Sequence, residues 1–260
     1  MKLTVLGTSA PFPRPGNACS GYLLASENKG QSTNVWIDAG TGTFAELQRH
    51  VDLADIDAIF VSHRHADHSA DLFVAYYALE AGSVRPNRRI RVLGPEALAD
   101  RLAEFLGPDA RQGLAEVFDF IELTGWGDAV VGDLTLSWGP VSHGVPAFAL
   151  TVAENEAEGG SIRSRFTYSG DTAPCTSLVE MAEESSVLLC EVGYAREALG
   201  VPAVHHTPED AGQSAAAAGV ETLILTHIDG ELEPADAVRR ARTHFAGQIV
   251  IAEPGASYSV

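Results

Sequence analysis

The stretch SHRHADH at residues 62–68 constrains the fold more than any other part of this sequence. It places His63, His65, Asp67 and His68 within six residues, directly after the apolar run at 59–61. Imidazole nitrogen and carboxylate oxygen are the ligands that a borderline-soft divalent ion such as zinc prefers. If residues 57–61 form a strand, the first two histidines can point the same way from its exit loop, while Asp67 and His68 can face a second ion.

Chance does not explain this cluster well. With 9 histidines in 260 residues, three at set positions fall together in about 1 in 25,000 windows, before an aspartate is required as well. The stretch therefore predicts a metal site rather than a polar surface loop.

Length and composition predict a single domain over residues 1–260. The chain is long enough for a substantial core, and no repeat or linker-like change in composition divides it. Three scattered cysteines have no paired spacing, which predicts reduced thiols and a cytoplasmic protein. We find no apolar stretch of signal-peptide or membrane-span length, so we expect no membrane partner.

The net charge of −18 weighs against a polyanionic partner. It results from 17 basic and 35 acidic residues, whereas a protein that grips a nucleic-acid backbone normally carries a basic surface. Bound divalent ions would reverse the sign of the charge locally. The charge therefore disfavours nucleic acid but leaves a small anionic substrate open.

The hydrophobic pattern predicts two mixed sheets with helices on their outer faces, an α/β (α+β) fold of four layers. Strands are expected at 2–6, 21–25, 34–37, 57–61, 90–93, 117–122, 129–131, 134–138, 147–152, 165–168, 187–190, 222–225 and 249–251. Helices are expected at 44–50, 70–80, 96–106, 208–218 and 234–245, and Pro95 is placed at the first helical position of the third.

Three further metal-ligating residues stand just after predicted strands, as Asp67 and His68 do. They are His143, Asp171 and His227. Strand ends on one side of a sheet are places where side chains remote in sequence converge. We therefore expect these three residues to join the cluster at 63–68.

In this order of motifs the sequence resembles the metallo-β-lactamase superfamily over nearly its whole length. The resemblance implies an αββα sandwich with two divalent ions at one edge, zinc first, with manganese or iron also accommodated. It implies that one ion is held by His63, His65 and His143 and the other by Asp67, His68 and His227, with Asp171 bridging both. Asp38 matches an aspartate that supports the site from behind the ligands, and it can also start the turn at 38–43.

The stretch VHHTPEDA at 204–211, followed by an Ala-rich helix, resembles the ribonuclease Z branch of that superfamily. LGTS at 6–9 and YSGDT at 168–172 also resemble this branch. The resemblance implies that His205 is a general acid or base. His205 and Asp67 are the candidate catalytic residues. Sequence leaves open whether His205 or the neighbouring His206 faces the site. Further supporting residues are Thr207 and Glu191, although a structural cap also explains the latter.

The interval 144–170 distinguishes this chain from ribonuclease Z proper. The resemblance implies that ribonuclease Z proper carries a long basic arm at this place, which grips tRNA. Here the interval contains only two predicted strands and an acidic loop at 154–160. The chain is more similar to short bacterial phosphodiesterases, including cyclic nucleotide phosphodiesterases. We therefore expect attack by a metal-bridging hydroxide on a small phosphodiester, most concretely 3′,5′-cyclic AMP, with His205 protonating the leaving oxygen.

Three alternatives remain at this stage. The first is tRNA 3′ processing with a partner subunit. The second is lactone or thioester hydrolysis, in which Tyr194 would serve as an oxyanion donor and His205 would have no evident task. The third is a non-catalytic binding module, which the complete ligand set disfavours. The resemblance also implies a homodimer.

Overall fold

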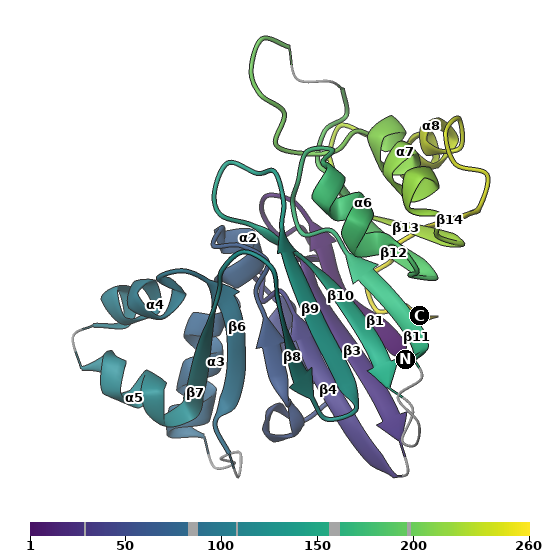
Figure 1. The fold of residues 1–260 in the computed structure, drawn as a ribbon. Helices are drawn as coiled ribbons and strands as arrows, with labels where there is room; N and C mark the ends of the chain where they lie inside the picture. Colours follow the sequence, from purple (N-terminus) through teal and green to yellow (C-terminus); the bar gives the residue numbers. More distant parts are fainter. Residues whose placement is uncertain (29, 83–87, 108, 156–161, 197–198) are drawn as a thin grey trace.

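The computed structural model describes residues 1–28, 30–82, 88–107, 109–155, 162–196 and 199–260. Two β-sheets pack face to face, with helices covering the outer face of each (Figure 1). The predicted αββα class is confirmed. Among the described helices, none has the length and hydrophobicity that crossing a membrane requires.

The first sheet is built from the N-terminal half of the chain and closed by its last strand. In spatial order it contains β15 (Ser257–Ser259), β1 (Lys2–Ser9), β3 (Gly21–Asn28), β4 (Gln31–Ile37), β5 (Ala58–Phe60), β6 (Ile90–Pro95) and β7 (Phe118–Leu123), and β2 (Ala18–Cys19) pairs with β1. Pairing is antiparallel from β15 to β4 and parallel from β4 to β7. The outer face of this sheet packs against α1 (Thr43–Leu47), α3 (Asp71–Ala81), α4 (Leu98–Leu106) and α5 (Ala110–Val117).

The second sheet comes from the C-terminal half. Its order is β14 (Gln248–Ile251), β13 (Thr222–Ile228), β12 (Val187–Val192), β11 (Ile162–Tyr168), β10 (Phe148–Asn155), β9 (Leu134–Pro140) and β8 (Gly127–Val131). Its outer face packs against α6 (Thr176–Ala182), α7 (Pro208–Ala218) and α8 (Pro234–Ala241). The remaining helices are the short α2 (Ala66–Ser69) and the 3-10 turn Leu53–Asp55.

The main core lies between the sheets. Leu3 and Leu24 of the first sheet and Leu150 and Phe166 of the second are fully buried in one cluster. Removing such side chains from water is the dominant favourable contribution to folding, at about 1.5–3 kcal/mol for each. The sandwich therefore gives a rigid base for the loops at its edge.

Helix α7 shows how local sequence fixes one of these elements. Thr207 caps its first turn: the hydroxyl accepts a hydrogen bond from the Asp210 N–H, and the Asp210 carboxylate in turn accepts one from the Thr207 N–H. Pro208 occupies the first turn, where a missing N–H costs nothing, and Gly219 ends the helix in the left-handed conformation. The predicted range 208–218 is confirmed.

The prediction for Pro95 is wrong. This residue ends strand β6, where it pairs with Leu123 of β7, and helix α4 begins only at Leu98. Ala97, with a left-handed φ of 62°, separates the strand from the helix. A proline is tolerated at the end of a strand as well as in a first helical turn, so local preference did not distinguish the two.

Other boundaries also differ from those expected. Helices α1 and α8 end earlier than predicted, and α2, α5, α6, β2 and β15 were not predicted. Elements α2, β2 and β15 have too few residues to show a hydrophobic period. Helix α5 does show one, because Ala110, Leu114 and Val117 form its buried face, but it was missed.

Candidate metal centre

The candidate ligands lie near the ends of strands, or in the segments that follow them, at one edge of the two sheets. Asp38 follows β4, the segment 63–68 follows β5, and Asp171 follows β11. His143 lies between β9 and β10, and His227 is near the end of β13. Strands β4 and β5, like β11, β12 and β13, run parallel. Their carboxyl ends therefore meet at the same edge.

Backbone contacts hold the loop after β5 in place. The N–H of Ala39 donates to the carbonyl of His68, and the N–H of Asp71 donates to the carbonyl of Ala39, each at 2.8 Å. At Gly40 a Cβ would lie 2.1 Å from the carbonyl oxygen of Asp67. Glycine is therefore required at position 40, because a side chain there would block the close backbone approach that positions Asp67 and His68.

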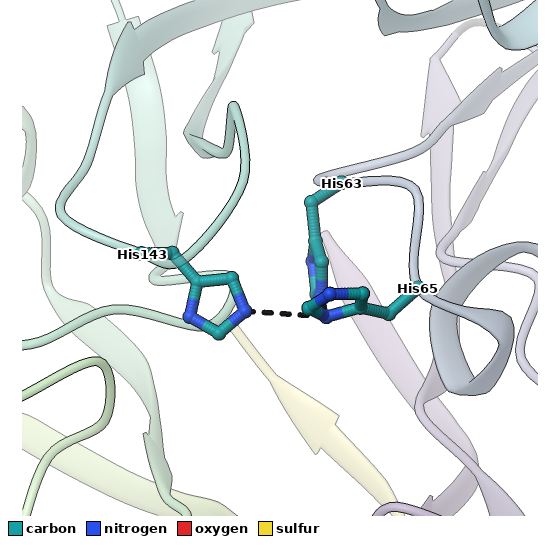
Figure 2. A group of neighbouring side chains, drawn as sticks. All are labelled: His63, His65 and His143. Atoms are coloured by element: carbon teal, nitrogen blue, oxygen red, sulfur yellow. Dashed lines mark hydrogen bonds between the residues drawn. The ribbon is translucent and has the colours of Figure 1, made fainter.

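One group of three imidazoles faces a common space (Figure 2). His65 Nδ1 lies 3.0 Å from His63 Nε2 and 3.2 Å from His143 Nε2. His63 is fully buried, whereas His143 is half-buried and His65 is exposed. The side chains thus present three nitrogen donors to one point.

A second group combines two carboxylates and two imidazoles, all buried: Asp67, His68, Asp171 and His227. His227 Nε2 lies 3.4 Å from Asp67 Oδ2 and 3.3 Å from Asp171 Oδ2. His68 Nε2 lies 3.3 Å from Asp171 Oδ1. The other carboxylate oxygen of Asp171 is 3.7 Å from His63 Nε2, so this residue lies between the two groups.

These spacings fit divalent ions. Four ligands at 2.0–2.1 Å around a tetrahedral zinc ion lie about 3.3 Å from one another. His68 Nε2 and Asp171 Oδ1 are buried, and among the described residues neither has a hydrogen-bond partner, although they are 3.3 Å apart. A cation between them would satisfy both atoms. The nitrogen and oxygen donors present therefore fit two divalent ions.

Asp38 supports the second group from behind. It is fully buried, and its Oδ2 accepts hydrogen bonds of 2.7 Å from His68 Nδ1 and of 2.7 Å from the Tyr168 hydroxyl. The Ser62 N–H donates to Oδ1 at 2.7 Å. A carboxylate on Nδ1 fixes the imidazole with Nε2 facing the site and raises its basicity. Tyr168 was quoted in the sequence motif but assigned no role, because nothing local shows that it reaches across the sandwich to Asp38.

Two residues of the centre have strained backbones. Asp38 and His227 have φ angles of 54° and 49°, in the left-handed region that non-glycine residues seldom adopt. Such conformations persist only where the surrounding structure imposes them, and they concentrate at functional sites. Asp38 directly follows β4 and His227 is the penultimate residue of β13; the side chain of Asp38 contacts His68 and that of His227 contacts Asp171.

Opposite charges within the second group stabilise one another. Burial opposes the charged form of Asp171, but the imidazoles of His227 and His68 hold the pKa of this carboxyl well below its ordinary value. Burial likewise opposes protonation of His68, yet Asp171 and Asp38 raise the pKa of its imidazole well above the usual range. The carboxylates of the second group therefore stabilise positive charge placed among them.

His205 stands beside the two groups and is paired with Glu191. Its Nδ1 donates to Glu191 Oε1 at 3.0 Å and lies 3.9 Å from Asp171 Oδ2. Its ring stacks on that of His227, with centroids 5.6 Å apart. Burial alone would lower the pKa of His205, but the hydrogen bond and charge of Glu191 outweigh it and raise the pKa to about 9.

Glu191 does more than pair with His205. Its carboxylate accepts hydrogen bonds from the backbone N–H groups of Thr172, Gly193 and His206. A Cβ at Gly193 would lie 2.7 Å from His205 Nδ1, so this glycine is needed for the imidazole to sit where it does. The role of Gly193 was not found from the sequence, since it depends on a contact twelve residues further along the chain.

His206 points away from the cluster. It is fully buried; its Nδ1 donates to the Thr172 carbonyl at 2.6 Å, and its Nε2 lies 3.0 Å from Ser214 Oγ. Of the two neighbouring histidines, His205 is thus the one at the site. The hydroxyl of Thr207 is hydrogen-bonded to Asp210 at the start of α7, so its support of the site is indirect. His50 and His244 are exposed.

Comparison with known proteins shows which sequences and folds this chain is similar to. The sequence profile of the β-lactamase superfamily domain matches residues 33–228. An uncharacterised protein of Mycobacterium tuberculosis is 32% identical over 96% of this chain and 88% of its own length. A ribonuclease Z of Ignicoccus hospitalis is 29% identical over 87% of each chain. The crystal structure of the metallo-β-lactamase fold protein YhfI of Bacillus subtilis superposes with a TM-score of 0.83 at 23% identity, covering 99% of each chain.

Proposed function

Because the chain belongs to the metallo-β-lactamase superfamily, in its ribonuclease Z-like branch, and is a metal-dependent hydrolase, we propose that it cleaves small phosphodiesters. The most concrete substrate is 3′,5′-cyclic AMP, which would be converted to the 5′-monophosphate. The observation that carries this proposal is the His205–Glu191 pair beside the metal centre. A proton donor there has a clear task in expelling a sugar oxygen, whereas the thiolate of a thioester leaves without one.

The family uses two metal ions, and we assign their ligands from the two groups of side chains. His63, His65 and His143 would hold one ion, Asp67, His68 and His227 the other, and Asp171 would contact both. When bound, the ions supply a water-derived nucleophile near neutral pH and neutralise charge on the phosphoryl oxygens. His/Asp ligation favours zinc and also suits manganese or iron.

His205 would act as the general acid. Its Nδ1–H is engaged by Glu191, which leaves Nε2 to carry a second proton toward the substrate. As an oxygen atom from water joins phosphorus, the bond from phosphorus to the 3′ oxygen breaks, and that oxygen takes the proton from Nε2. Positioned proton transfer of this kind contributes about 10²- to 10⁴-fold to the rate.

Substrate size is inferred from the interval between His143 and Asp171. Strands β10 and β11 occupy most of it and pair directly with each other. The acidic stretch predicted at 154–160 falls largely in 156–161, outside the described residues. A 27-residue interval of which these two strands take the larger part, in a chain of net charge −18, favours a small substrate over tRNA.

Ribonuclease activity is the second candidate. It is favoured by the 29% identity to the ribonuclease Z of Ignicoccus hospitalis over most of both chains. In that reaction the same His205 would protonate the sugar oxygen released from an RNA strand. The two candidates therefore differ in substrate and not in the residues that act.

The deciding experiment compares bis(p-nitrophenyl) phosphate, 3′,5′-cyclic AMP and a tRNA precursor as substrates, with zinc or manganese and after chelation. Turnover of the aryl diester and of cyclic AMP, both abolished by the chelator, would support the proposal. Turnover of the aryl diester with trimming of the tRNA precursor, and none of cyclic AMP, would move the assignment to ribonuclease activity. Activity on none of these in protein with two bound metals would refute phosphodiester cleavage.

His205→Ala tests the assigned acid. We expect both metals to remain bound and turnover of cyclic AMP to fall by about 10²- to 10⁴-fold. The matched control is His50→Ala, because His50 is also a histidine but is exposed and belongs to none of the clusters that could hold a metal among the described residues. Loss of metal from the His205 variant would show that it is a ligand and would contradict its role as acid.

A further inference from the structure

Tyr194 lies against the imidazole of His205. The two ring centroids are 5.1 Å apart and the ring planes meet at 73°, an edge-to-face arrangement. Aromatic pairs favour this arrangement at centroid separations of about 4.5–7 Å. Both residues belong to the connection between β12 and α7, and Tyr194 is in none of the clusters that could hold a metal among the described residues.

The ring of Tyr194, rather than its hydroxyl, makes the contact. Its hydroxyl forms no hydrogen bond with any described residue, and the side chain is half-buried. By contrast, the hydroxyls of Tyr22, Tyr168 and Tyr258 each have a hydrogen-bond partner. The aromatic ring is therefore the part of Tyr194 that the structure uses.

His205 depends on its neighbours for its orientation, because it lies outside the helices and strands. Its Nδ1 is hydrogen-bonded to Glu191, which fixes that atom but leaves the ring able to turn about the bond. The ring of His227 is inclined by 23° to the imidazole and that of Tyr194 by 73°, so the two restrict this rotation from different directions. Nε2 of His205 is thereby held in one direction.

Backbone contacts hold Tyr194 in turn. Its N–H donates to the carbonyl of His206 at 3.1 Å. The N–H of the next residue, Ala195, donates to Asp229 Oδ2 at 3.4 Å, and its carbonyl accepts a hydrogen bond of 2.7 Å from the Arg240 guanidinium. The segment that carries the ring is thus tied to the loop after β13 and to helix α8.

We propose that Tyr194 is a positioning residue, whose ring holds the His205 imidazole with Nε2 directed at the leaving oxygen. This inference rests on the proposed function, because it supposes that His205 is the proton donor. A sugar oxygen needs that proton as its bond to phosphorus breaks, whereas p-nitrophenolate is a stable anion and leaves without it. Tyr194 should therefore matter for the first kind of leaving group and not for the second.

The kinetic test compares Tyr194→Ala with Tyr194→Phe in the metal-loaded protein. Tyr194→Ala should lower kcat for cyclic AMP by about 10- to 100-fold, since misplacing a reacting group by about 1 Å costs on the order of 100-fold. Its kcat for bis(p-nitrophenyl) phosphate should stay within about 2-fold of the wild-type value. Tyr194→Phe keeps the ring and should retain most of the turnover of cyclic AMP. Equal losses on both substrates in Tyr194→Ala would overturn the inference.

A double-mutant cycle tests whether Tyr194 acts through His205. In a His205→Ala background, Tyr194→Ala should have little further effect on cyclic AMP, because the imidazole that it positions is gone. Losses that simply multiply would show that Tyr194 acts independently of His205 and would contradict its role.

The imidazole ¹⁵N signals of His205 give a readout that needs no turnover. They are recorded in the zinc-loaded protein and assigned by their absence from His205→Ala. Tyr194→Ala should shift or broaden them, and Tyr194→Phe should leave them close to the wild-type positions. Signals unchanged in Tyr194→Ala would show that the ring does not position His205.

These outcomes separate the inference from the proposed function. If neither cyclic AMP nor the tRNA precursor is turned over, the proposed function fails, but signals that move in Tyr194→Ala and not in Tyr194→Phe still support Tyr194 as the residue that positions His205. Turnover of cyclic AMP that Tyr194→Ala leaves intact overturns the inference and leaves the phosphodiesterase in place.

Discussion

Replacement of Asp38 by asparagine tests whether the metal centre depends on a carboxylate behind its ligands. In the structure Oδ2 accepts hydrogen bonds from Ser62 Oγ, His68 Nδ1 and the Tyr168 hydroxyl at 2.7–2.8 Å, while Oδ1 accepts the Ser62 N–H at 2.7 Å. Asparagine keeps one acceptor oxygen and puts an NH₂ group in place of the other. Whichever way it is placed, at least one buried donor then faces a donor.

The expected loss of stability follows from the hydrogen bonds that Asp38→Asn removes. A buried N–H left without an acceptor costs about 1–3 kcal/mol, and the bonds that remain lose the strength that a charged acceptor gives them. Relief of burying a charge offsets part of this loss. We therefore expect Asp38→Asn to lower the free energy of unfolding by about 2–4 kcal/mol and the metal affinity by about 10- to 100-fold.

The assay combines urea unfolding of the chelated protein with a competition titration of metal against a chromophoric chelator. Tyr168→Phe serves as the control, because it removes one donor from Asp38 but keeps the carboxylate on His68. It should cost about 1 kcal/mol of stability and leave metal affinity near that of the wild type. An Asp38→Asn protein with wild-type metal affinity and a stability change below about 0.5 kcal/mol would refute the reasoning.

Three further predictions concern the acid and the metals. The pKa of His205 is raised to about 9, so the folded protein favours the protonated imidazole, and activity that depends on this proton is lost as pH rises through that value. Glu191→Gln should therefore move the alkaline limb of the activity profile to lower pH. An unmoved limb would argue against the pairing of His205 with Glu191. Gly193→Ala places a Cβ 2.7 Å from His205 Nδ1, so kcat should fall while metal content, measured by elemental analysis, stays at the wild-type level. Chelation should lower the melting temperature, since ligands that bind only the native state stabilise it; equal melting curves with and without chelator would contradict metal binding by the folded chain.

Sequence reasoning is strongest where the signal is local. The spacing of His63, His65, Asp67 and His68 after a strand predicts metal-ligating side chains, and the structure places them in two clusters that could hold metal ions. Helix α7 was predicted with its observed ends because Thr207, Pro208 and Gly219 are strong local signals for helix boundaries. The layered architecture followed from the alternation of apolar strands and helices, which reflects burial directly.

Only the tertiary structure decided the arrangements that depend on contacts between distant segments. It selects His205 over His206, because Glu191 on β12 engages the first while Thr172 and Ser214 bury the second. It brings Tyr168 to Asp38, 130 residues apart. Strand β6 also extends to Pro95, because pairing with β7 outweighs the helical preference of that position. Residue types and spacing specify which chemistry is possible; the packing of the two sheets specifies which side chains meet to perform it.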